Sequence, residues 1–79
     1  PAGAEVADEQ RVVRSPVAGV VVRVPAQPGQ AIATDDLLLV IEAMKMETHV
    51  TAARDGRIAA IRVAEGDGVK VGQVLVELD

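Results

Sequence analysis

The chain has 79 residues, a net charge of −4 at pH 7, and neither cysteine nor aromatic residues. A domain of this length buries only about 60% of its unfolded surface, which leaves no room for a large buried active site. Without a basic cluster or stacking aromatics, nucleic acid and anionic membranes are not expected partners. No apolar run approaches the roughly 18 residues of a membrane-spanning helix. The lack of cysteine fits a reducing cytosol or organelle matrix, and we expect a cytoplasmic location.

The N-terminal residues 1–11 are small and acidic and show no periodicity. This composition predicts the end of a flexible linker, followed by one folded domain over residues 12–79. Because the chain begins with Pro1 rather than methionine, we expect it to be a piece of a longer polypeptide.

From residue 12 onwards the chain consists of short valine-rich segments separated by Gly, Pro and Asp, which is typical of strands and not of helices. Along residues 57–63, the apolar Ile58 and Ile61 are three positions apart, so we expect a bulge or bend near Ala59–Ala60. In chain order, the predicted strands are Val12–Ser15, Gly19–Val24, Ala31–Ala33, Leu37–Ala43, Met46–Ala52, Arg57–Val63, Val69–Val71 and Val74–Leu78.

The predicted strands form two copies of one unit, because the chain aligns with itself without a gap at an offset of 37 residues. Gly19 falls on Gly56 and Gly29 on Gly66, and apolar positions coincide throughout. Two units are too few for an open solenoid, so they should close on each other about a pseudo-twofold axis. The pattern predicts an all-β fold of two antiparallel sheets packed as a flattened barrel. A small open barrel or a meander would be alternatives.

The two halves meet in the segment Glu42-Ala43-Met44-Lys45-Met46-Glu47, which we interpret as a hairpin with Met44–Lys45 at its tip. Two-residue hairpin loops prefer positive φ, which Met and Lys adopt at a cost. A local rule broken at a tight turn often marks a functional site. The symmetry suggests that this tip lies on or near the axis.

Lys45 is one of only two lysines, and the only two methionines flank it. A lysine amine is almost fully protonated near neutral pH, and its neighbours Glu42 and Glu47 are carboxylates, so the base that activates it must come from a partner enzyme. Lys45 is therefore interpreted as the substrate of a modifying ligase, with Met44 and Met46 as recognition residues, although a solvated loop lysine is the simpler alternative.

Three other residues are weaker candidates. His49 is the only histidine, and without cysteine a metal site is not expected. Ser15 precedes a proline and lies outside any nucleophile-elbow pattern, so a triad with His49 is rejected. Lys70 has no methionine neighbours and should remain unmodified.

The sequence around Lys45, Glu42-Ala43-Met44-Lys45-Met46, resembles the signature of biotinyl domains, the biotin carboxyl carrier modules of biotin-dependent carboxylases and decarboxylases. The likeness extends over the glycine turns at residues 15–19 and 52–56 and over the C-terminal repeat at residues 65–75. Two departures, Val17-Ala18 for Met-Pro and Pro28-Gly29-Gln30 for a Gly-Asp turn, leave the detailed shape of one loop open.

The resemblance implies a barrel-sandwich fold of two four-stranded sheets with biotin joined to Lys45 through an amide. It also implies a non-catalytic carrier, modified by biotin protein ligase, that moves carboxylate between a biotin carboxylase and a carboxyltransferase. Because the halves align without a gap, the thumb that one family variant inserts is predicted to be absent, and the biotin should contact its own domain little. A lipoyl carrier and an unmodified module of the same shape are the alternatives.

Overall fold

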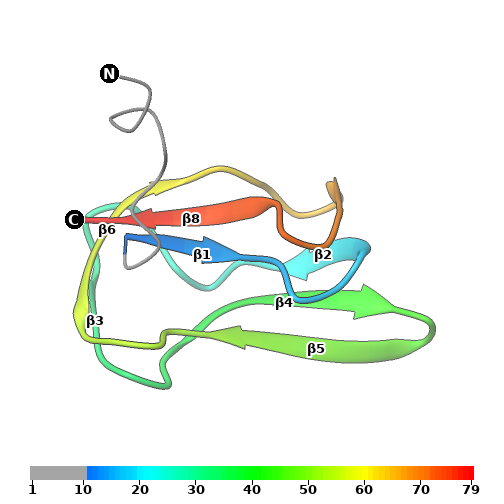
Figure 1. Cartoon of the computed structure of the whole chain (residues 1–79), viewed down its shortest axis with the longest axis horizontal. Coiled ribbons are helices and arrows are strands. Elements are labelled where there is room, and N and C mark those ends of the chain that lie inside the picture. The colour runs from blue at the N-terminus through cyan, green and yellow to red at the C-terminus, as the bar shows by residue number, and fades with distance from the viewer. Residues whose placement is uncertain (1–10) are drawn as a thin grey trace.

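The computed structural model describes residues 11–79, and its regular elements are short strands (Figure 1). None of the described residues forms a helix long and apolar enough to cross a membrane. The predicted strands are all present, with ends that differ by at most two residues. They are β1 (Val12–Arg14), β2 (Gly19–Arg23), β3 (Ala31–Ile32), β4 (Leu37–Ala43), β5 (Met46–Thr51), β6 (Gly56–Ile61), β7 (Gly68–Val69) and β8 (Val74–Leu78).

The strands form two four-stranded antiparallel sheets, ordered β1-β8-β6-β3 and β5-β4-β2-β7. The offset of 37 residues turns one order into the other, since it pairs β1 with β5, β2 with β6, β3 with β7 and β4 with β8. Each sheet thus takes strands from both halves of the chain. The pseudo-twofold fold predicted from the repeat is confirmed, and neither half can form its sheets without the other.

The hydrogen bonds between the halves repeat with the same symmetry. The N–H of Gly29 donates to the carbonyl of Ile58 at 2.7 Å, and the N–H of Gly66 donates to the carbonyl of Val21, also at 2.7 Å. Both glycines have positive φ, 85° and 95°, which a residue with a Cβ adopts only at a cost.

The bulge predicted near Ala59–Ala60 is present, and it occurs twice. The register of β6 against β8 shifts between Ile58 and Ala60, and that of β2 against β4 shifts between the equivalent residues Val21 and Arg23. A bulge bends and twists a strand, so the paired bulges curve both sheets around a shared core.

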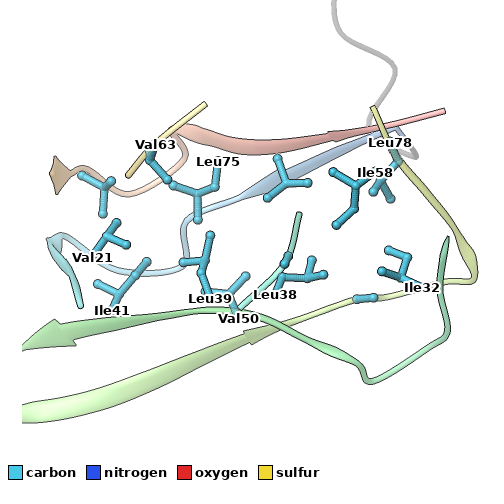
Figure 2. Packing of buried hydrophobic residues seen from close by; sticks show 14 residues of the cluster. Val21, Ile32, Leu38, Leu39, Ile41, Val50, Ile58, Val63, Leu75 and Leu78 are labelled. Atoms are coloured by element: carbon cyan, nitrogen blue, oxygen red, sulfur yellow. The ribbon is translucent and has the colours of Figure 1, made fainter. Parts of the chain in front are cut away.

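The core fills the space between the two sheets with aliphatic side chains (Figure 2). Leu39 of β4 points towards Leu75 of β8, and Ile41 of β4 lies beside Val21 of β2; all four side chains are fully buried. Leu38 of β4 and Leu75 of β8 are equivalent residues of the repeat. The strand register shifts at Leu38 in the pairing of β4 with β5 and at Leu75 in the pairing of β1 with β8, and both side chains are fully buried. Without aromatic side chains, this packing requires the sheets to lie close together.

The connection between β2 and β3, residues 24–30, contains no inserted strand and is matched by residues 62–67 in the second half, so the thumb is absent as predicted. The loop at Pro28-Gly29-Gln30, whose shape the sequence did not determine, forms the same turn as its counterpart in the second half. Gln30 accepts a hydrogen bond from the N–H of Gln27 at 3.0 Å, as Asp67 accepts one from Ala64 at 2.9 Å. The side-chain amide oxygen of Gln30 thus accepts the hydrogen bond that the carboxylate oxygen of Asp67 accepts in the other half.

The hairpin tip does not lie on the pseudo-twofold axis, contrary to our expectation. The axis exchanges β4 with β8 and β5 with β1, so the counterpart of the tip is the place where β1 begins and β8 ends. These two regions lie at opposite ends of the molecule (Figure 1). Arg11 joins β8, because its carbonyl accepts a hydrogen bond from Leu78 at 2.7 Å. The rest of the predicted linker, residues 1–10, lies outside the described residues.

Candidate functional site

The site is the hairpin formed by β4, which has seven residues, and β5, which has six. The last pairs of its ladder are Glu42 with Glu47 and Ala43 with Met46, which leaves Met44 and Lys45 as the two-residue loop. On the other side of β4, the pairing with β2 ends at Val20 opposite Glu42. The tip therefore projects beyond the neighbouring strand.

Both loop residues have positive φ, 53° at Met44 and 66° at Lys45. This is the arrangement of a type I′ hairpin turn, which glycine and asparagine adopt with least strain. A residue with a larger side chain in this conformation costs about 1–3 kcal/mol. The cost predicted from the sequence is thus present, and the strands and core of the domain hold the loop in place against it.

The side chains at the tip are open to solvent. The exposed fraction is 95% for Met44 and 72% for Met46, and Lys45 is also exposed, whereas Ala43 is half-buried. Neither methionine belongs to the core cluster. Burying these flexible thioethers against a partner would be favourable, because they leave water without losing hydrogen bonds.

Gly19, the first residue of β2, allows the hairpin to pack against the body of the domain. A Cβ atom at Gly19 would clash with the main-chain oxygen of Glu42 and would lie 3.0 Å from the Cβ of Ala43. The sequence identified Gly19 as the end of a turn, the start of a predicted strand and the counterpart of Gly56 in the repeat, but not as a contact with β4. Its role is a close contact between two backbones at the base of the tip.

Two carboxylates face each other just below the tip, since Glu42 and Glu47 are directly paired and both are exposed. His49 lies two residues further along β5, with its Nε2 4.0 Å from Oε1 of Glu47. Like charges directly opposite each other on a sheet are destabilising. The base of the hairpin is therefore an acidic surface.

The resolved pKa shifts concern residues outside this hairpin. The main-chain N–H and the hydroxyl of Thr34 both donate to Oδ1 of Asp55, and these hydrogen bonds hold the pKa of Asp55 below its usual value. Arg62 donates to Glu77 at 2.7 Å and lowers the pKa of that carboxyl in the same way.

Ser15, His49 and Lys70 do not join the hairpin tip in one site. Ser15 is buried, and its hydroxyl donates to the carbonyl of Val17 at 2.6 Å. Within residues 11–79, no cluster of three or more His, Cys, Asp or Glu residues could hold a metal ion. Lys70 is exposed in the turn between β7 and β8, without a methionine beside it.

Comparison with known proteins identifies the family. Residues 11–78 match the family model described as biotin-requiring enzyme, so the chain belongs to the biotin/lipoyl attachment family. It is 44% identical over 72 residues to the human mitochondrial propionyl-CoA carboxylase alpha chain, which covers 91% of this chain and 10% of that protein. It is 30% identical over 78 residues to the biotin carboxyl carrier protein of Streptococcus mutans, covering 99% of this chain and 60% of that protein.

Solved structures agree with this assignment. A single-chain, multi-domain long-chain acyl-CoA carboxylase matches with a TM-score of 0.81 and 33% identity, over 85% of this chain and 7% of that one. The lipoyl domain of the 2-oxoglutarate dehydrogenase complex from Azotobacter vinelandii matches with a TM-score of 0.74 and 33% identity, over 87% of this chain and 95% of that one. The chain spans about a tenth of the length of the propionyl-CoA carboxylase alpha chain.

The chain is a biotin carboxyl carrier domain, homologous to the biotinyl domains of carboxylases, and its cofactor is biotin. The lipoyl alternative has less support, because the sequence relatives described above are biotin-dependent proteins. The residues present fit the cofactor: an exposed primary amine on a projecting turn can form an amide with the biotin carboxyl group without disturbing the core.

Proposed function

We propose that Lys45 is the residue that carries biotin, through an amide between its Nζ and the biotin carboxyl group. The observation that supports this most directly is the position of Lys45, exposed at the tip of a hairpin that projects beyond its neighbouring strand. The amine is therefore accessible to an incoming enzyme. The alternative amine, Lys70, is also exposed, but it lies in the turn between β7 and β8, which is closed by two hydrogen bonds between Lys70 and Gln73.

A biotin protein ligase supplies the chemistry that the domain lacks. The Lys45 amine must lose a proton before it can attack an activated biotin carboxyl group and displace its activating group, and a lysine amine is almost fully protonated near neutral pH. The ligase therefore provides the base. In this proposal, Met44 and Met46 are the side chains that the ligase and the carboxylase partners recognise, and Ala43 and Glu42 complete the recognised segment.

The domain acts as a carrier and forms no bonds itself. Biotin, once attached, carries activated carboxylate between the active sites of a biotin carboxylase and a carboxyltransferase. The start of β1 and the end of β8 lie at the opposite end of the molecule from the hairpin (Figure 1), so a tether at that end leaves the tip free to enter a partner. A tether joined at that end would hold the tip at an effective concentration on the order of millimolar around each partner.

The attached biotin is expected to contact its own domain little, because residues 11–79 form no thumb beside the hairpin. Propionyl-CoA and other acyl-CoA carboxylases are the relatives that suggest the parent enzyme. The cytoplasmic location expected from the sequence stays a prediction.

Intact mass after coexpression with a biotin ligase tests the proposal. We expect the mass of one biotinyl group to be added to the native chain and to Lys70→Arg, and no addition to Lys45→Arg. Arginine keeps the charge and tolerates the same turn, so the loss would report the missing amine. Addition of lipoate instead, or no modification of the native chain, would refute the assignment.

A further inference from the structure

The large hydrophobic side chains that the described residues leave exposed are not scattered over the surface. They are Met44 and Met46 in the hairpin, Val20 at the start of β2 with an exposed fraction of 45%, and Val71 in the turn before β8 with 68%. The start of β2, the turn before β8 and the hairpin all lie at one end of the molecule (Figure 1). Exposed apolar residues that gather in one place mark an interaction site.

The internal repeat provides a control for this observation, because the other end of the molecule has the same backbone. The equivalents of Ala18 and Val71 are Asp55 and Thr34, whose side chains are joined by a hydrogen bond of 3.1 Å. The equivalent of Val20 is Arg57, which donates to the carbonyl of Gly29 at 2.7 Å. The fold therefore does not require apolar residues at these positions, and the opposite end fills them with hydrogen-bonded polar ones.

We call Ala18, Val20 and Val71 the end patch. It is continuous with the hairpin, because Val20 is paired directly with Glu42 and because Gly19, between Ala18 and Val20, contacts the backbone of β4. Ala18 and Val71 lie just beyond the pair formed by Gly19 and Val69. All three residues of the patch are exposed.

We propose that the end patch is a docking surface for the biotin ligase. This inference rests on the proposed attachment at Lys45. A lysine side chain extends from the backbone by only four methylene groups, so an enzyme that acts on its bare amine must bring its own surface against the base of the hairpin. A carboxylase meets the biotin ring at the end of a longer arm and can act without covering the patch. Because the unmodified lysine side chain is short, we expect the enzyme that binds the end patch to be the ligase and not the carboxylase.

The charges beside the patch define the chemistry of the surface that fits it. Glu42 of β4 is paired with Val20 of β2 on one side and with Glu47 of β5 on the other. The three side chains form a row across the sheet that changes from apolar at Val20 to acidic at Glu42 and Glu47. A ligase surface with an apolar centre and a lysine or arginine facing these carboxylates would bury Val20 and relieve their repulsion.

A triple variant that copies the opposite end tests the proposal: Ala18→Asp, Val20→Arg and Val71→Thr. The other half of the fold already accommodates these residues, so the variant should fold, and its thermal unfolding is measured to check this. We expect kcat/KM for biotinylation of Lys45 by a biotin ligase to fall more than tenfold, mainly through KM. The reverse variant at the other end, Thr34→Val, Asp55→Ala and Arg57→Val, should be biotinylated at the native rate.

Carboxylation of the two proteins after complete biotinylation separates the possible occupants. We expect biotin carboxylase to act on the biotinylated triple variant and on the native carrier at equal rates. Unchanged biotinylation of the triple variant would overturn the proposal, and so would a loss confined to carboxylation, which would assign the patch to the carboxylase. Failure of the native chain to accept biotin would instead refute the attachment site, so the two outcomes are distinct.

Discussion

The α-carbon of Gly19 lies so close to β4 that a Cβ atom there would clash with the main-chain oxygen of Glu42. Its equivalent, Gly56, has a different environment. A Cβ at Gly56 would meet only the end of the Arg54 side chain, with Nη1 at 2.8 Å. A backbone atom cannot move aside without shifting a strand, whereas a long side chain can rotate.

This difference predicts unequal effects for the same substitution. Gly19→Ala should lower the free energy of unfolding by about 1–3 kcal/mol, as overpacking against backbone does, and should slow biotinylation by displacing the base of the hairpin. Gly56→Ala should cost less than about 1 kcal/mol and leave the biotinylation rate unchanged. Chemical denaturation and ligase kinetics measure both, and equal costs for the two variants would contradict this account.

The positive φ of Met44 predicts that a substitution there can stabilise the fold and at the same time weaken recognition by the ligase. Asparagine tolerates positive φ better than methionine, so Met44→Asn should raise the free energy of unfolding by about 1 kcal/mol. The same change removes an exposed thioether and should slow biotinylation. Met46→Asn is the matched control, because Met46 lies in β5 and has no positive φ to relieve. A gain of stability in both variants would show that turn strain is not the cause.

The exposed methionines also predict sensitivity to peroxide. Hydrogen peroxide should convert Met44 and Met46 to sulfoxides, each adding one oxygen to the mass while the peroxide is reduced to water. A sulfoxide is polar, so its burial against the ligase is less favourable and biotinylation should slow at least severalfold. Methionine sulfoxide reductase should restore the rate.

The double variant Met44→Leu, Met46→Leu serves as the control for that experiment. It retains apolar side chains and should be insensitive to peroxide, because the rest of the chain contains no methionine or cysteine. If peroxide slowed modification of the double variant as much as that of the native chain, oxidation of the methionines would not be the cause.

Asp55 predicts a pH dependence of stability. Its pKa is lower in the folded state than in the unfolded state, because the N–H and hydroxyl of Thr34 stabilise the carboxylate. This stabilisation is present above the unfolded pKa and is lost as the pH falls through the folded value. Asp55→Asn should therefore be less stable than the native chain at neutral pH, and the two stabilities should converge in acid.

Thr34→Val distinguishes the two hydrogen bonds in that comparison. It removes the hydroxyl donor but retains the main-chain N–H, which is the larger cause of the shift, so its pH profile should lie between the other two. Denaturation at a series of pH values provides the profiles. Curves for the native chain and Asp55→Asn that remain parallel down to the acid limit would exclude a role for the Asp55 charge.

Much of the fold could be predicted from the sequence because the repeat is visible in it. Ile58 and Ile61 revealed a bulge through their spacing alone, and the gapless alignment excluded a thumb. The turn at Gln30 could not be predicted, because a longer amide side chain takes over the hydrogen bond that Asp67 makes in the other half. Such a replacement depends on distances between atoms and not on residue type.

The candidate site divides in the same way. The sequence located Lys45 between its methionines, but it placed the tip on the symmetry axis, where it does not lie. The end patch was missed, although the alignment of Ala18 with Asp55 and of Val71 with Thr34 contained the signal. An alanine or valine in a sequence does not indicate whether it is buried, and both types also occur throughout this core.

The sequence by itself determined the strands, the twofold repeat and the residue available for modification, because hydrophobic period, turn residues and a rare lysine are local properties of the chain. Only the tertiary structure decided that each sheet combines strands from both halves and that the hairpin lies at the opposite end of the molecule from the start of β1 and the end of β8. It also decided that Gly19 touches Glu42 and that Val20 and Val71 remain exposed beside the tip. These features depend on contacts between residues distant in sequence, which a local pattern does not specify.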